Sequence, residues 1–393
     1  MNNCCLILFL LIISSVLGFK EEIEISNVCF EELLRLSKRH DLAHIVYYEL
    51  TKRNCAIDDP IKQKFKKQYE IALYRDAVRC LTLKYLKELF CQIQIPFISL
   101  KGSGMIDNYP QSWMRTSADI DILVKKEDIR TVERKLVESG FVKTGEGSHD
   151  ISFVKNGFSH IELHHTLIED YVLPDASKML SKAWDYAIPK DDTGIEFVLP
   201  GELDYLYHIA HMAKHFVHGG CGIRSVLDQY ILKNKYKYLE QVINKYLKSS
   251  GLDVFEEKIN ELSQVWFGNR NMTSDLEQLS EFVINGGLYG SSKQGTAVKR
   301  ISQSRTRYYI ERIFQPYNTM KQQYRVLTRI PILLPLFWII RWFKLVNKKV
   351  FKNAKKEIQT EKSINNEYVN KTGFLLAFLG LNNERKQREY EKG

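Results

Sequence analysis

Two short apolar runs in the first third of the chain most restrict its fold. IPFISL and ADIDILV are too short for helices and rich in branched and aromatic residues, so they predict β-strands at 94–100 and 118–124. The second run carries Asp119 and Asp121 at alternate positions. Because side chains alternate between the faces of a strand, both acids point to one face and the isoleucines between and after them point to the core.

Three more strands follow. FVKTG, DISFVKNG and SHIELHHTL each have strand character, and Asn156-Gly157 is typical of a hairpin turn between the last two. Between the second and third strands, KEDIRTVERKLVESG predicts a helix closed by Gly140. Residues 5–17, 29–52 and 60–93 read as helices, and almost everything beyond residue 200 is helical in pattern.

The pattern predicts an α+β protein in which helices flank a small mixed sheet. We expect an N-terminal helical segment at 1–93, a sheet core at 94–170, a mostly helical domain at 171–346 and a basic tail, solvated or mobile, at 347–393. The tail includes the lysine-rich stretch NKKVFKNAKKEIQTEKSINNEYVNK.

The positive charge is concentrated in the last quarter of the chain. Residues 291–393 hold 22 Lys and Arg against 7 Asp and Glu, a balance of +15, so the first 290 residues sum to −5 within the total of +10. A phosphate-rich or membrane-surface partner is therefore a question about that quarter. Nucleic acid stays open as a partner, although no RNA-binding motif is present.

The N-terminal run CCLILFLLIISSVLGF has two interpretations. It is apolar like a secretory signal, but the residues before it carry no Lys or Arg. We favour a buried helix that packs against 29–52, with a secreted chain as the alternative. The seven cysteines are scattered without a C-x-x-C pair, which indicates reduced thiols. The expected location is cytoplasmic, with peripheral contact to a membrane as an added option.

Two carboxylates on one face of a half-buried strand suggest a cation site. Mg²⁺ or Mn²⁺ takes oxygen ligands, and Mg²⁺ in particular is often held by carboxylates together with substrate phosphates. An edge strand with a solvated acidic face is the other interpretation. Two neighbouring features favour the metal: KGSG stands where a strand turns into a helix and exposes backbone N–H groups, and Glu162 projects from a later strand between two core residues.

This succession resembles the DNA polymerase β-like nucleotidyltransferase superfamily. More narrowly, the chain is similar to an uncharacterised nucleotidyltransferase family often encoded near bacterial polysaccharide genes. The resemblance is carried by ISLKGSGM, YPQSWMRTSADIDILV, LVESGF, HIELHH, HMAKHFVHGGCGIRSVLDQY and RIPILLPLFWIIRWF. It departs from the superfamily in the Lys before the glycine and in a longer gap between Ser103 and Asp119.

The resemblance implies roles for particular residues. Asp119, Asp121 and Glu162 would be the metal ligands and catalytic groups, and Gly102 and Ser103 would contact nucleotide phosphates. We expect the Glu162 strand to lie beside the 118–124 strand, with the three carboxylates on one face.

Cationic residues near these motifs are further candidates for phosphate contact. Lys101 and Arg115 flank the glycine turn and the D-x-D strand. Lys214 and His215 belong to a helix on which four histidines form one stripe, which we expect to line the cleft opposite the carboxylates; a zinc cluster has no supporting Cys or H-E-x-x-H. The stripe comprises His208, His211, His215 and His218.

The segment 330–356 joins an aromatic and apolar run to a basic run. It is too short and too interrupted by proline for a spanning helix. It fits either peripheral contact with an anionic membrane or packing against the helical domain.

The leading hypothesis is a metal-dependent nucleotidyltransferase. It would move a nucleoside monophosphate from an NTP co-substrate to an unidentified hydroxyl or phosphate acceptor. The alternative is a catalytically silent scaffold of the same fold that binds a nucleotide or a partner, with or without a membrane.

Overall fold

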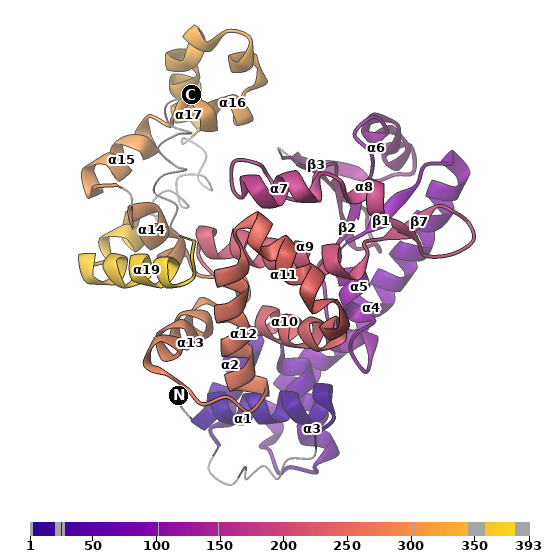
Figure 1. Cartoon of the computed structure of the whole chain (residues 1–393), viewed down its shortest axis with the longest axis vertical. Coiled ribbons are helices and arrows are strands. Elements are labelled where there is room, and N and C mark those ends of the chain that lie inside the picture. The colour runs from indigo at the N-terminus through magenta and orange to yellow at the C-terminus, as the bar shows by residue number, and fades with distance from the viewer. Residues whose placement is uncertain are drawn as a thin grey trace. The chain divides into compact units, whose positions relative to one another are not determined.

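The structure is a computed structural model, and it describes residues 3–19, 25, 28–100, 102–147, 149–301, 303–344 and 358–381. The chain divides into two compact units, which are taken separately below (Figure 1). The first comprises Met1–Lys214 and Gly222–Leu288, and the second comprises His215–Cys221 and Tyr289–Gly393.

A seven-stranded mixed sheet forms the centre of the first unit. Its strands, in the order in which they lie, are β3 (Val142–Glu146), β4 (Asp150–Val154), β5 (His160–His164), β2 (Asp119–Leu123), β1 (Phe97–Ser99), β7 (Glu196–Val198) and β6 (Ile188–Pro189). The pairs β2–β5 and β1–β7 are parallel, and the other pairs are antiparallel. The α+β class is confirmed, and so are the five predicted strands.

Two glycines hold the positive φ that the turns around these strands need. Gly157 (φ 80°) follows Asn156 in the β4–β5 hairpin, as predicted. Gly140 (φ 85°) follows α6 (Ile129–Glu138), the helix that carries the chain from β2 to β3. Strands β6 and β7 were not predicted, because they span two and three residues and have no alternating pattern of their own.

One face of the sheet is covered by two helices and forms the main core. The 35-residue helix α4 (Asp59–Ile93) lies alongside β1, β2 and β7 in Figure 1. Its Leu86, Leu89 and Phe90 are buried together with core-facing side chains of the strands and with apolar residues of α6. This arrangement leaves the opposite face of β2 and β5 for the polar side chains. The strand residues in the core include Phe97, Ile120, Ile122, Ile151, Phe153, Ile161 and Leu163.

The N-terminal apolar run is helical and buried in this structure. It forms α1 (Asn3–Ile12) and a π-helical turn (Ile13–Leu17). It packs against α2 (Phe30–Arg39) and α3 (Ala43–Lys52). The ring of Phe9 stacks on Trp266 with centroids 4.7 Å apart. None of the helices in the described part of the chain has the length and hydropathy needed to cross a bilayer.

The remaining helices of the first unit pack around these elements. They are α5 (Gly102–Ile106), α7 (Pro174–Leu180), α8 (Ala183–Tyr186), α9 (Gly201–His218, whose last four residues belong to the second unit), α10 (Ile223–Lys235), α11 (Glu240–Ser250), α12 (Asp253–Phe267) and α13 (Ser274–Gly286).

A buried histidine joins the N-terminal helices to this helical part. The Nε2 atom of His40 lies 3.0 Å from the carbonyl oxygen of Ile284, and its Nδ1 accepts a hydrogen bond from the backbone N–H of Ile223. The imidazole is therefore neutral, with its proton on Nε2. Burial lowers the pKa of His40 to about 4, and the nearby Arg39 adds to the effect.

Because of this lowered pKa, the free energy of unfolding should depend on pH. Between about pH 4 and 6.5 the unfolded chain binds a proton at His40 and the folded chain does not, so stability falls as pH falls through this window. We expect His40→Gln to weaken the pH dependence of the free energy of unfolding by about 2 kcal/mol between pH 7 and pH 5. Urea denaturation of both proteins at the two pH values measures it. Equal pH dependence in the two proteins would contradict the prediction.

The second unit is helical in its described parts. Its helices are α14 (Ser292–Ile301), α15 (Arg305–Ile313), α16 (Tyr317–Gln323), α17 (Leu334–Lys344) and α19 (Asn366–Phe378). The expectation of a solvated tail fails for residues 358–381. There Glu361 is fully buried and pairs with Arg300 and Arg305 at 2.6 and 2.8 Å, and α19 packs against α14. Apolar residues at helical spacing in 369–376 explain this packing. The many lysines before them in the sequence had suggested a polar segment.

Candidate functional site

Strand β2 presents its two aspartates on the face opposite the core. Ile120 and Ile122 are buried in the core, so Asp119 and Asp121 point the other way. The parallel register sets Asp121 opposite Glu162 on β5, and Asp119 opposite His160. Residues paired directly across two strands share a face. The predicted arrangement, with the Glu162 strand beside the D-x-D strand and its carboxylate on the same face, is therefore confirmed.

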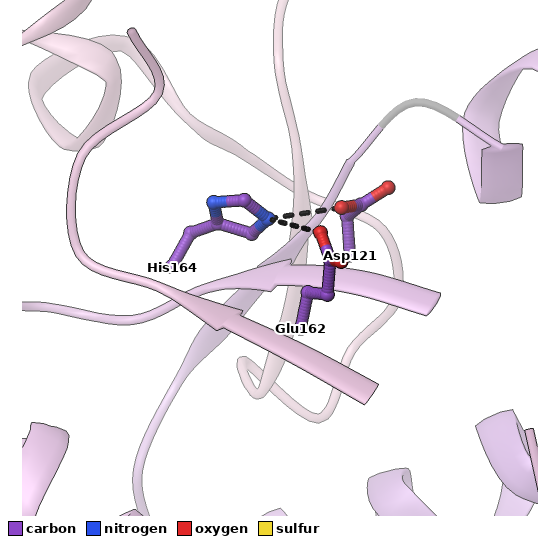
Figure 2. Close-up of side chains that lie close together, drawn as sticks. All are labelled: Asp121, Glu162 and His164. Atoms are coloured by element: carbon purple, nitrogen blue, oxygen red, sulfur yellow. Dashed lines mark hydrogen bonds and ion pairs between the residues drawn. The ribbon is translucent and has the colours of Figure 1, made fainter. Parts of the chain in front are cut away.

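Asp121, Glu162 and His164 converge on this face (Figure 2). The Nε2 atom of His164 lies 2.9 Å from Oδ1 of Asp121 and 3.6 Å from Oε2 of Glu162. One potential ligand atom from each residue lies within 4.8 Å of the others. The side chains of Asp121 and His164 are almost fully buried, whereas that of Glu162 is 25% exposed. In the described part of the chain, this is the one group of three or more His, Cys, Asp or Glu residues with metal-site spacing.

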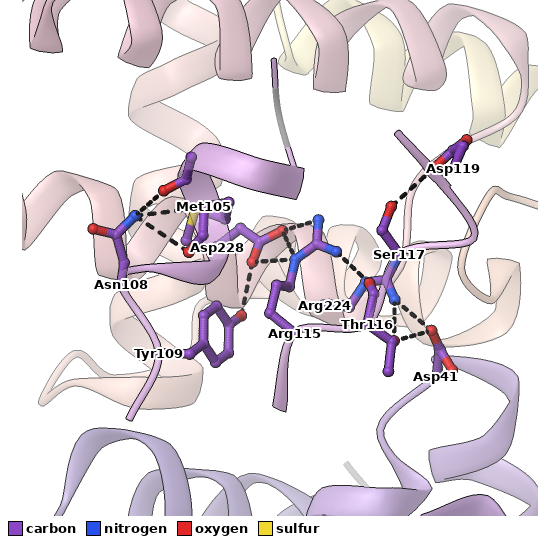
Figure 3. A network of polar contacts seen from close by, with 11 residues as sticks. Asp41, Met105, Asn108, Tyr109, Arg115, Thr116, Ser117, Asp119, Arg224 and Asp228 are labelled. Atoms are coloured by element: carbon purple, nitrogen blue, oxygen red, sulfur yellow. Dashed lines mark hydrogen bonds and ion pairs between the residues drawn. The ribbon is translucent and has the colours of Figure 1, made fainter. Parts of the chain in front are cut away.

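Asp119 lies on the same strand face but outside that group. Its Oδ1 accepts a hydrogen bond of 2.9 Å from the hydroxyl of Ser117, two residues earlier (Figure 3). The side chain is half-buried, so it remains accessible from the solvent side. The structure thus brings Asp121 and Glu162 together and holds Asp119 beside them, at the start of the strand.

A second charged cluster lies next to His164. The ring of His149 is 5.5 Å from the ring of His164, centroid to centroid, and its Nδ1 lies 3.0 Å from Oε1 of Glu169. The ammonium of Lys214 on α9 lies 2.8 Å from Oε2 of Glu169. A chain of close side chains therefore runs from α9 to the carboxylate pair on β2 and β5.

The charges in this cluster are set by burial and by Lys214. Burial lowers the pKa of His149 to about 4, and the positive charge of Lys214 acts in the same direction. Burial alone would raise the pKa of Glu169, but the hydrogen bond and the positive charge of Lys214 lower it below its usual value. At neutral pH the cluster is an ion pair of Lys214 and Glu169 beside a neutral imidazole.

Arg115 is a predicted phosphate-contacting residue that this structure pairs with a carboxylate. Its guanidinium holds Asp228 of α10 through Nε and Nη2, each 2.9 Å from a carboxylate oxygen (Figure 3). The hydroxyl of Tyr109 donates to the same carboxylate at 2.7 Å. Nη1 of Arg115 donates to the carbonyl of Thr116 at 2.7 Å. Arg115 thus fixes the loop that leads into β2.

A neighbouring contact fixes the same loop to the N-terminal helices. The hydroxyl of Thr116 donates to Oδ2 of Asp41 at 2.6 Å, and Arg224 of α10 pairs with the same Asp41 carboxylate. Burial would raise the pKa of Asp41, but the charge of Arg224 leads the effects that lower it below its usual value. The loop that leads into the aspartate strand is therefore held by two ion pairs, Arg115 with Asp228 and Arg224 with Asp41.

The other predicted phosphate-contacting residues lie in different parts of the chain. Lys101 and the side chain of Ser103 lie outside the described residues, whereas the backbone of Gly102 begins α5. The N–H of Leu100 donates to the carbonyl of Asp121, which puts the glycine turn next to that residue. His215 belongs to the second unit, where its ring lies 6.0 Å from that of Tyr289.

The histidines of the α9 stripe have different neighbours in the described structure. His208 is buried, and burial lowers its pKa to about 4. The ring of His211 lies 6.2 Å from that of Tyr207 on its own helix. These histidines do not appear as a group with metal-site spacing among the described residues.

Sequence reasoning missed three residues of the site region. His164 could have been found, because it stands two positions after Glu162 on the same strand and therefore shares its face. His149 and Glu169 lie in loops around β4 and β5, and only the fold brings them to Lys214.

Comparison with known proteins gives one match. A family model described as "Uncharacterised nucleotidyltransferase" matches residues 26–268, which include the whole sheet and the helices from α2 to α12. Neither the curated proteins nor the solved structures contain a match to the chain.

Proposed function

This chain belongs to the uncharacterised nucleotidyltransferase family, and from that membership we propose that it moves a nucleoside monophosphate from an NTP to a hydroxyl or phosphate acceptor at the β2–β5 face. The observation that carries the proposal is the direct register of Asp121 with Glu162. Two acids in adjacent parallel strands, one of them buried, repel each other unless a positive group joins them. Such a pair is costly to folding and suited to chemistry on a polyphosphate.

The donor set fits a divalent cation. Two carboxylates and one imidazole, with ligand atoms within 4.8 Å of one another, would hold it through Asp121, Glu162 and His164, and Asp119 would add a further oxygen from the start of the strand. Oxygen donors suit Mg²⁺ and Mn²⁺, and an imidazole donor favours Mn²⁺ over Mg²⁺. When bound, such a cation offsets the negative charge of the reacting phosphates.

The protein's own side chains have distinct tasks in this proposal. Glu162 is the accessible member of the group, so its carboxylate is positioned to accept the proton of an acceptor hydroxyl as its oxygen attacks the α-phosphorus and pyrophosphate leaves. Before a cation binds, the contact of His164 with Asp121 holds that buried carboxylate in one orientation. The turn at Gly102, beside Asp121, offers backbone N–H groups to the nucleotide phosphates.

The cationic residues predicted to contact phosphate have different roles in this proposal. Arg115 and Lys214 neutralise Asp228 and Glu169 in this structure, so we give them a positioning role rather than direct phosphate contact. Lys101, Ser103 and His215 remain sequence-based proposals for phosphate contact.

The test is nucleotide consumption by the full-length protein. Each labelled NTP is incubated in turn with Mg²⁺ or Mn²⁺, pyrophosphate release is followed, and mass spectrometry identifies any labelled product. The proposal expects release with at least one NTP and a large loss in Asp119→Ala and Asp121→Ala. Equal release by wild type and both variants would exclude this site. NTP binding without release in any condition would favour the silent scaffold.

Metal binding makes an independent prediction about stability. A cation that binds the folded chain alone stabilises it by about 2.7 kcal/mol at one hundred times its dissociation constant. We therefore expect Mn²⁺ or Mg²⁺ to raise the melting temperature of wild type. Glu162→Gln should lose most of that gain while the metal-free variant stays folded, because one repelling charge is removed.

The control for this prediction is Glu196→Gln. Glu196 is a buried carboxylate on the same sheet, but its partners are Ser99 and Lys190 on the core face. This variant should keep the full metal-dependent rise. A rise of equal size in wild type and in Glu162→Gln would remove Glu162 from the metal site.

A further inference from the structure

Helix α17 in the second unit has apolar side chains on two opposite sides. On its inner side, the rings of Trp338 and Trp342 each pack on Phe314 with centroids 5.2 and 5.3 Å apart. The indole N–H of Trp338 donates to the carbonyl of Gln315 at 2.8 Å, and that of Trp342 donates to the carbonyl of Ile313, the last residue of α15, at 2.9 Å. These contacts fix the orientation of α17 within its unit.

The outer side of the same helix is also apolar. We call it the outer stripe, and it consists of Ile332, Leu336, Ile339, Ile340 and Phe343. Spacings of three and four residues put these side chains on one side of the helix and of the turn before it. Ile332 is 84% exposed and Phe343 is 72% exposed, and the other three lie between 36% and 50%. A solvated helix would carry polar residues there.

Other apolar side chains of the second unit are exposed as well. Ile310 and Ile313 of α15 and Val326 are each about half exposed. Isolated exposed apolar residues are ordinary on proteins, but a contiguous group marks an interaction site.

The positive charge of the surrounding sequence indicates which kind of partner the outer stripe fits. Residues 329–356 contain two Arg and six Lys and no Asp or Glu. Exposed apolar side chains beside a run of cationic residues match a surface with an apolar interior and anionic headgroups. A nucleic acid could pair with the positive charges, but it would leave the apolar side chains of the outer stripe in water. The described part of α17 has its apolar side chains along the helix axis, so we expect it to lie in the plane of the surface.

From these observations we propose that the outer stripe seats the protein on an anionic lipid surface. The stripe inserts among the headgroups, and the basic sequence that flanks it supplies the preference for negative charge. The proposal is independent of nucleotidyl transfer, since it uses only residues of the second unit.

The experiment is co-sedimentation of the full-length chain with vesicles of phosphatidylcholine alone and of phosphatidylcholine mixed with phosphatidylglycerol. We expect binding to the mixed vesicles to be at least tenfold tighter than to the neutral ones, and to weaken as salt is added. The double variant Ile332→Ser/Phe343→Ser should bind the mixed vesicles at least tenfold more weakly than wild type. Its far-UV circular dichroism should match wild type, because both side chains are exposed.

The matched control is Tyr238→Ser, which removes a 79% exposed aromatic side chain from the first unit. It should bind vesicles like wild type. Equal binding by wild type and the double variant would overturn the proposal, and so would wild-type binding that ignores lipid charge. Light scattering is run in parallel. A wild-type dimer that the double variant converts to monomer, without vesicle binding by either, would assign the stripe to a second copy of the chain.

Discussion

Pyrophosphate release should fall about 10³-fold when Asp121 is replaced by asparagine, which corresponds to about 4 kcal/mol of lost transition-state stabilisation. The change is nearly isosteric, so the strand and the contact with His164 can be kept while the charge is lost. Asp121 is the buried carboxylate of the group and is in register with Glu162. Its charge therefore acts where water screens it least.

The measurement is steady-state pyrophosphate release at saturating NTP for wild type, Asp121→Asn and Glu196→Gln. The third protein removes a buried carboxylate from the core face of the same sheet and should stay within a few-fold of wild type. Equal losses in both variants would mean that any buried strand charge matters, and the assignment of Asp121 would fail. Melting curves of all three proteins separate loss of chemistry from loss of fold.

The second large effect expected is on stability, from Asp228→Ala. This change leaves the guanidinium of Arg115 and the hydroxyl of Tyr109 buried without the carboxylate that both contact. Removing one partner of a buried ion pair costs about 3–5 kcal/mol. Urea denaturation should show a loss of that size, and Asp228→Asn, which keeps the oxygen acceptor, should lose less.

An exposed ion pair provides the comparison. Glu70 lies 3.7 Å from Lys66 on α4, and both side chains are about half exposed. Glu70→Ala should cost less than about 1 kcal/mol, because water and salt screen such a pair. If Asp228→Ala cost no more than Glu70→Ala, the buried network would not hold the β2 entry loop as described.

The sequence predicted the parts of the site that depend on local pattern. Alternation within ADIDILV sets the direction of Asp119 and Asp121, and the same rule applied to SHIELHHTL directs Glu162 away from the core. The helix between these strands allows the parallel return that aligns them. These inferences need only the strand period and the path of the chain through α6, β3 and β4.

The parts that sequence did not predict depend on contacts between distant residues. Nothing near Arg115 in sequence indicates that Asp228 will neutralise it, and Lys214 meets Glu169 across a separation of 45 positions in the chain. A cationic residue beside a phosphate-binding motif reads the same from sequence whether it faces a ligand or a carboxylate of its own chain. Strand β7 was missed for a related reason, since its three residues pair with β1 across almost one hundred intervening positions.

The link between Arg115 and Asp228 also has a consequence for the order in which the newborn chain acquires its structure. The two residues are 113 positions apart. At a synthesis rate of about 5–20 residues per second, roughly 6–23 seconds pass between the appearance of the β2 entry loop and that of its partner on α10. Both carboxylate strands emerge from the ribosome within that interval. The nascent chain therefore holds Asp119, Asp121 and Glu162 before it holds the anchor that fixes the first of their strands.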